Sequence, residues 1–159
     1  MIFGLDCSST RTGWGVLDLT GQRISSGVVQ PRASLPFWER LVEMAHYLGG
    51  IATTYKPLVV AVEAPVMVSK FKGSSTLQVA QAMGVCTVAV LQRAYDGARV
   101  FQYQPSTLKK QVTGNGRAEK KDMVEHIGRI YRLPLLDLTD DEADALAAAL
   151  THYRKEIAK

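Results

Sequence analysis

With 159 residues, of which 47% are hydrophobic and 21% charged, the chain has the size and composition of a globular protein with one sizeable core. No apolar run approaches the roughly 20 residues needed to cross a bilayer, and two cysteines are too few for a disulfide framework, which excludes a membrane-spanning protein and a disulfide-stapled scaffold. The net charge of +4 favours an anionic partner only weakly.

The N-terminal segment MIFGLDCSSTRTG has neither a basic lead nor a long apolar core, so it does not resemble a signal peptide. We therefore expect a cytoplasmic protein with no membrane partner. The two cysteines, Cys7 and Cys86, fit a reducing compartment. The His and Cys residues show no spacing typical of a structural zinc site.

Hydrophobic patterning predicts five strands and five helices. The first three strands are expected in IFGLD (2–6), TGWGVLDL (12–19) and QRISSGVVQ (22–30), the last two as a hairpin. Next we expect a helix from about 36 to 55, a strand buried on both faces at LVVAVE (58–63) and an uncharged, buried helix over 74–92. The strand ARVFQYQ (98–104), a short Pro-led helix, and helices from about 118 to 131 and from about 140 follow. This order predicts an α/β fold, with a five-stranded mixed sheet flanked by helices, in one domain over 1–159.

Two of the predicted buried strands end on a carboxylate, Asp6 in IFGLD and Glu63 in LVVAVE. In a parallel α/β sheet, ligand sites form outside the carboxyl ends of neighbouring strands, so we expect the two acids to lie close together. They would repel each other unless a cation lay between them. For either residue alone, a strand-end acid hydrogen-bonded to nearby backbone is the ordinary alternative.

The helix expected from about Asp140 supplies further acids. Thr139 and Glu142 fit a capping box, and acids in the first turn favour the positive helix N-terminus. Asp141 and Asp144 are three residues apart and share one face, which continues into small apolar residues that allow close approach to a sheet. An unpaired buried carboxylate is costly, and a divalent cation removes that cost.

The four acids Asp6, Glu63, Asp141 and Asp144 form an oxygen-rich set without clustered His or Cys, which suits Mg²⁺ or Mn²⁺. We predict that they hold two Mg²⁺ ions per site, with Mn²⁺ as the alternative ion. Two ions about 4 Å apart activate a water and stabilise a leaving oxygen. The sequence therefore predicts phosphodiester hydrolysis.

The segment between Lys109 and Lys121 is basic, with one acid against five cations: Lys109, Lys110, Arg117, Lys120 and Lys121. A phosphate-binding surface and a solvated basic loop and helix face both fit such a run. Phosphate contacts would set affinity and register without reading base sequence. The GNG inside the segment either lets the backbone approach a phosphate or forms a turn.

Five motifs follow one another along most of the chain: FGLDCSSTRTGWGV, VVAVEAPVM, LQVAQAMGVCTVAV, LKKQVTGNGRAEKKDMV and DEADALAAALTH. Together they resemble the RuvC-type Holliday junction resolvases of the RNase H-like (retroviral-integrase) superfamily. The resemblance implies an RNase H-like fold and a metal-dependent endonuclease that makes paired symmetric cuts in four-way DNA junctions. It also implies catalytic acids at the four positions named above, DNA contacts from the basic segment, and dimerisation through the uncharged helix. Lys120 would position or protonate the leaving group.

Two positions depart from the family's pattern. The family usually has Pro-Gly directly after the first catalytic Asp, where this chain has Cys7 and a serine, so the turn must be shaped differently. The family's base-contacting aromatic after the catalytic Glu is replaced by Val66. Phe71, in the adjoining VSKFKGS loop, either takes its place or packs in the core, and we predict DNA contacts from Phe71, Lys70 and Lys72.

The uncharged helix over 74–92 predicts a homodimer by a separate argument. One face of a helix in a domain this small packs on the sheet and the opposite face usually reaches the surface, so an apolar opposite face favours a partner subunit. A helix fully covered within the monomer is the alternative. A two-fold dimer suits a four-way junction, because two identical sites can cut two symmetric strands. Junction branch-migration proteins would be further partners.

Two other functions fit parts of the sequence. A nuclease of the same fold acting on RNA or on other branched DNA would need the same acids. FGLDCSSTRTGWGVLDL also resembles the phosphate loop of actin-like and sugar-kinase ATP-binding proteins, although those proteins use two such domains. A junction-binding module without cleavage has no support, because all four acids are present.

Overall fold

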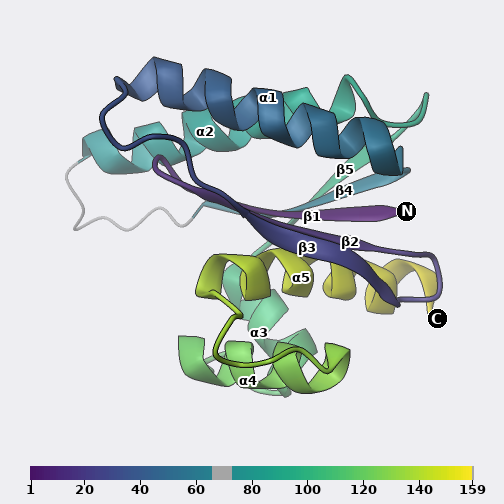
Figure 1. Ribbon diagram of the computed structural model, residues 1–159. Coiled ribbons are helices and arrows are strands. Elements are labelled where there is room, and N and C mark those ends of the chain that lie inside the picture. The colour runs from purple at the N-terminus through teal and green to yellow at the C-terminus, as the bar shows by residue number, and fades with distance from the viewer. Residues whose placement is uncertain (66–72, 159) are drawn as a thin grey trace.

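A five-stranded mixed sheet forms the centre of the computed structural model, which describes residues 1–65 and 73–158 (Figure 1). Its strands are β1 (Ile2–Cys7), β2 (Thr12–Leu17), β3 (Arg23–Val29), β4 (Val59–Glu63) and β5 (Arg99–Tyr103), in the order β3-β2-β1-β4-β5. The β1–β2 and β2–β3 pairs are antiparallel, whereas β1–β4 and β4–β5 are parallel. The predicted five strands and the mixed sheet are thus confirmed.

Helices cover both faces of the sheet (Figure 1). One face carries α1 (Phe37–Tyr55) and α2 (Gly73–Leu91). The other face carries α5 (Asp140–His152), with α3 (Pro105–Thr113) and α4 (Lys120–Tyr131) packed behind it and a short π-helix, η1 (Tyr153–Ile157), continuing it. All five predicted helices are present; those predicted at about 36–55, 74–92 and 118–131 begin and end close to these residues, and the last begins at Asp140 as predicted. None of the helices in the described part of the chain is long and apolar enough to cross a membrane.

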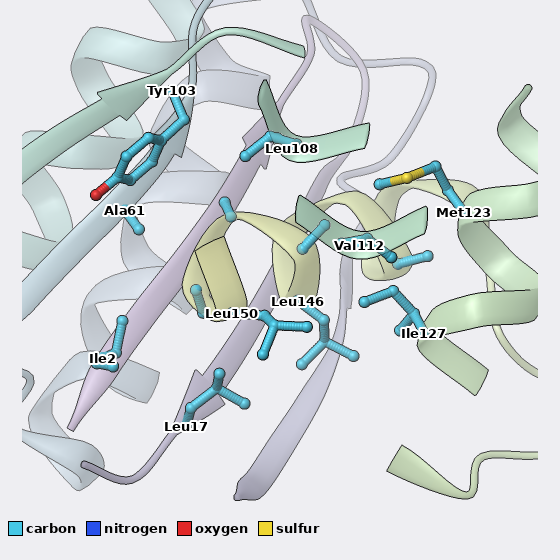
Figure 2. Close-up of a cluster of buried hydrophobic side chains, with 14 of the residues drawn as sticks. Ile2, Leu17, Ala61, Tyr103, Leu108, Val112, Met123, Ile127, Leu146 and Leu150 are labelled. Atoms are coloured by element: carbon cyan, nitrogen blue, oxygen red, sulfur yellow. The ribbon is translucent and has the colours of Figure 1, made fainter. Parts of the chain in front are cut away.

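Side-chain alternation along the central strands divides the core into two apolar clusters. Ile2 of β1 and Ala61 of β4 point toward α5, where they pack with Leu146 and Leu150 (Figure 2). The intervening residues point the other way, toward α1 and α2, and there they pack into a second cluster that includes Phe3, Leu5, Val60, Val62, Met44 and Cys86. Asp6 therefore shares its side of the sheet with Ile2 and α5, whereas Cys7 shares its side with α2.

Small residues let α5 lie unusually close to the sheet. A Cβ added to Gly4 would overlap the carbonyl oxygen of Ala145, and one added to Gly13 would overlap that of Asp141. No side chain fits at these two strand positions without moving the helix backbone. The predicted close approach of the alanine-rich helix is confirmed, and its cause lies equally in the glycines of β1 and β2.

The N-terminus of α5 carries only half of the predicted capping box. The Thr139 hydroxyl accepts a hydrogen bond from the Glu142 amide at 3.2 Å. The Glu142 carboxylate instead accepts from the Ser26 hydroxyl at 2.5 Å and lies 4.0 Å from Arg23. Glu142 therefore contacts Ser26 and Arg23 of β3 instead of the backbone N–H at the start of its own helix, because its side chain faces the hairpin.

Helix α2 is buried on one face only. Ala82, Cys86 and Val90 are fully covered, whereas the side chains of Leu77 and Val88 on the opposite face are 59% and 51% exposed. The prediction of a helix buried all round, and the alternative of full coverage within one monomer, are therefore wrong for the single chain. Some of the apolar side chains of this helix therefore lie on the exposed surface of the single chain.

Candidate metal and active site

Three acidic side chains converge at one end of the sheet. Asp6 and Glu63 lie near the ends of the parallel strands β1 and β4, whose register pairs Leu5 with Val62. Asp144 comes from the second turn of α5, which the glycine contacts bring close to the strands. One oxygen of each of the three carboxylates lies within 4.8 Å of the others. Strand register and side-chain alternation thus bring Asp6 and Glu63 together, and the close approach of α5 adds Asp144.

Burial and mutual repulsion raise the pKa of all three carboxyls. Desolvation, followed by the charges of Asp144 and Asp141, raises the pKa of Asp6 from 3.8 to about 7. Desolvation and the charges of Asp6 and Asp144 raise the pKa of Glu63 from 4.5 to about 8. Desolvation is also the main cause that raises the pKa of Asp144 to about 6, against the opposing charge of Lys120. The site therefore favours added positive charge, as protons or as a cation.

A divalent metal fits the donor set. All ligand atoms offered are carboxylate oxygens, which hard cations such as Mg²⁺, Mn²⁺ and Ca²⁺ prefer. The three carboxylates lie within 4.8 Å of one another and are partly shielded from water, and the charge of Lys120 offsets their mutual repulsion only in part. The residues that would hold the ion are Asp6, Glu63 and Asp144.

The fourth predicted acid, Asp141, lies beside this group rather than in it. It sits one turn before Asp144 on α5, is buried, and pairs through Oδ2 with Nε of Arg11. Its charge still contributes to the raised pKa of Asp6 and of Asp144. The sequence interpretation missed Arg11, because no pattern in CSSTRTG specifies that this turn meets the first turn of α5.

A cavity of about 230 Å³ opens over the three carboxylates. Its walls combine the acids with residues of several elements, namely Cys7, Ala64, Pro65, Val79, Met83 and Lys120. The sequence did not identify the α2 residues or Cys7 as part of the site. Their contribution depends on how α2 crosses the sheet, which periodicity does not specify.

The predicted basic residues lie near the site to different degrees. Lys120 lines the cavity, with its Nζ 3.8 Å from Asp140 Oδ2, and Lys109 is close enough to oppose the rise in the pKa of Glu63 and Asp144. Lys121 pairs with Glu119 at 3.2 Å. Lys110 and Arg117 are exposed.

The remaining predicted contacts concern two loops. In the GNG segment, Gly114 has φ of 81° and ends α3, so this glycine forms a left-handed helix cap, as the turn interpretation predicts. Lys70, Phe71, Lys72 and the Val66 position lie outside the described residues.

The strand order, the helices on both faces and the carboxylates at the ends of two parallel strands define a nuclease-type site on an RNase H-like fold. The family model for crossover junction endodeoxyribonuclease RuvC matches residues 2–152, and the chain belongs to this family. The crossover junction endodeoxyribonucleases of Afipia carboxidovorans and Rhodopseudomonas palustris are 40% and 41% identical to it over 95% of this chain, and over 86% and 85% of their own lengths.

Solved structures agree with this assignment. Thermus thermophilus RuvC in complex with a Holliday junction substrate superposes with a TM-score of 0.80 at 26% identity, covering 95% of this chain and 91% of that one. A fowlpox virus resolvase bound to junction DNA, 16% identical with a TM-score of 0.57, shares the fold. These matches give no support to the ATP-binding alternative.

Proposed function

We propose that this protein is a Holliday junction resolvase, a metal-dependent endonuclease that makes paired symmetric cuts in four-way DNA junctions by phosphodiester hydrolysis. The observation that carries the proposal is the convergence of Asp6, Glu63 and Asp144 in a chain that belongs to the RuvC family. The junction-bound Thermus thermophilus relative supports the four-way junction as substrate.

The metal in this proposal is Mg²⁺, with two ions per site and Mn²⁺ as the alternative. Asp6, Glu63 and Asp144 would supply the shared ligands, and Asp141 a fourth carboxylate once it leaves Arg11. When bound, two such ions supply an activated water and stabilise the oxygen that leaves the scissile phosphate. The three acids with raised pKa values would lose their protons in exchange for the cations.

Lys120 is the residue proposed to act on the leaving group. It lines the cavity with the three acids, and its side chain is 68% exposed, so its Nζ is free to approach a phosphate. There it would position the leaving oxygen or donate a proton to it. Lys109, Lys110, Arg117 and Lys121 are proposed to neutralise backbone phosphates, which sets affinity and orientation rather than sequence preference.

A homodimer through α2 would present two such sites to one junction. The exposed face of this helix carries Leu77 and Val88, and a Cβ added at Gly84 would meet nothing. An open apolar face with a small residue at its centre allows a second helix to approach closely. Sedimentation at micromolar concentration should report a dimer, and a monomer would count against paired cutting. A cytoplasmic location and cooperation with branch-migration proteins remain predictions of this function.

The decisive experiment compares a labelled synthetic four-way junction with a matched linear duplex and an RNA–DNA hybrid, each with and without Mg²⁺. Paired symmetric nicks in the junction alone are expected. Asp144→Asn should abolish these cuts while keeping or strengthening junction binding, because it removes negative charge near phosphates. Cutting of the hybrid instead would move the function to the RNA-directed alternative, and a fully active Asn variant would remove Asp144 from the site.

A further inference from the structure

The two cysteines of the chain lie in one buried cluster next to the candidate active site. Cys7, at the end of β1, and Cys86, in the middle of α2, belong to the same cluster of buried side chains, and each thiol shifts the pKa of the other, upward for Cys7 and downward for Cys86. Thr12, the cross-strand partner of Cys7, has its hydroxyl 3.8 Å from the same Cys86 sulfur. Three segments that are distant in the sequence therefore meet at this dithiol.

One of the two cysteines, Cys7, borders the catalytic cavity. Cys7 directly follows Asp6 and, although it is only 8% exposed, is one of the residues that line the cavity, so a small oxidant in the cavity lies beside it. Cys86, on the buried face of α2, is fully covered. The pair thus borders the cavity at Cys7 and has its second thiol within the same cluster.

We propose that Cys7 and Cys86 form a reversible disulfide that ties the end of β1 to α2 and switches off cleavage. With a peroxide as oxidant, two S–H bonds and one O–O bond break, one S–S bond forms, and the peroxide is reduced to two waters. A dithiol reductant reverses the step by thiol–disulfide exchange: the protein disulfide is reduced to two thiols, and the reductant is oxidised to its own disulfide. The effect on cleavage rests on the proposed function, whereas the bond itself does not.

The bridge would disturb Asp6 because an S–S bond is far shorter than a contact between two thiols, at about 2.05 Å. Closing it draws the end of β1 toward α2. Asp6 is the next residue and points to the opposite side of the sheet, where its carboxylate must stay within 4.8 Å of Glu63 and Asp144. A shift on the order of 1 Å in a positioned catalytic group can cost about a hundredfold in rate.

The test treats the full-length protein with hydrogen peroxide, removes the oxidant and measures junction cleavage in Mg²⁺. We expect the rate of junction cleavage to fall by about tenfold or more, and dithiothreitol should restore it. Alkylation under denaturing conditions followed by peptide mass spectrometry should find Cys7 and Cys86 joined within one chain. Cys86→Ala is the matched control, expected to cleave and to resist peroxide. Restoration by the dithiol also separates this bridge from methionine oxidation, which that reagent does not reverse.

Three results would overturn the proposal. They are two free thiols after peroxide treatment, a bridge within the chain that leaves cleavage unchanged, and the same dithiol-reversible loss in Cys86→Ala. The peptide mapping needs no variant, so it decides on the bridge even if Cys86→Ala does not fold. If the reduced protein cleaves no junction, the proposed function fails, and the mapping still tests the bridge separately.

Discussion

Replacing Asp6 by Asn should stabilise the metal-free protein although it abolishes cleavage. The wild-type fold holds Asp6 against Glu63 and Asp144, partly out of water, and its pKa rises from 3.8 to about 7. Each pKa unit corresponds to about 1.4 kcal/mol, so ionising this one carboxyl in the folded state costs roughly 4 kcal/mol. The Asn side chain keeps the shape and carries no charge. Since it must still bury a polar amide, we expect a gain of about 2–4 kcal/mol at pH 8.

The gain should depend on pH with a definite sign. Between the unfolded pKa near 3.8 and the folded pKa of about 7, the folded protein binds more protons at Asp6 than the unfolded chain. The contribution of Asp6 to the free energy of unfolding of the wild type therefore falls as pH rises through this window, by up to about 1.4 kcal/mol per pH unit. The Asn variant lacks this contribution. The difference between the two proteins should grow from about pH 4 to pH 7 and level off above it.

Urea unfolding at pH 5, 6, 7 and 8 in EDTA measures this difference. Asp96→Asn, at an exposed position outside the site, is the matched control and should show no such growth with pH. Adding Mg²⁺ should stabilise the wild type more than the Asp6 variant and narrow the gap, because the ion binds the folded acids. A difference that stays constant from pH 5 to 8, or a wild type more stable than the variant in EDTA at pH 8, would refute the electrostatic reasoning.

Three further substitutions test other parts of the argument. Lys120→Met should lower cleavage about a hundredfold and junction binding by less, measured by single-turnover kinetics and gel shift, and equal losses would reduce Lys120 to a phosphate contact. Gly13→Ala should destabilise the fold by about 2–3 kcal/mol in urea unfolding, because its Cβ would overlap the Asp141 carbonyl; an unchanged midpoint would contradict that packing. Val88→Glu should convert a dimer to a monomer in sedimentation with the fold intact, and a surviving dimer would place the interface elsewhere.

The strands and all three converging acids could be predicted from the sequence, because the signals for them are local. IFGLD and LVVAVE are short apolar runs that each end on an acid, and parallel strands place such ends together. Asp144 followed from helix periodicity and from the alanines around it. These features are local, or depend only on the pairing of neighbouring strands.

The parts that could not be predicted depend on how elements cross in space. The pairing of Arg11 with Asp141 requires the turn after β1 to meet the first turn of α5, and no pattern in CSSTRTG specifies that. The meeting of Cys7 and Cys86 in one buried cluster depends on the position of α2 along β1. Composition alone also could not decide how α2 is covered, since an uncharged helix does not reveal whether its second face meets the same chain or another one.

The glycines and the acids of this fold are two parts of one arrangement. Gly4 and Gly13 leave no room for a side chain, so α5 settles directly on β1 and β2 and carries Asp144 into reach of Asp6. The same closeness excludes water and raises the pKa of these acids, which makes the metal-free site costly. A looser contact would relieve that cost and would also separate the ligands. The stability lost at the acids and the capacity to hold a divalent cation therefore have the same structural origin.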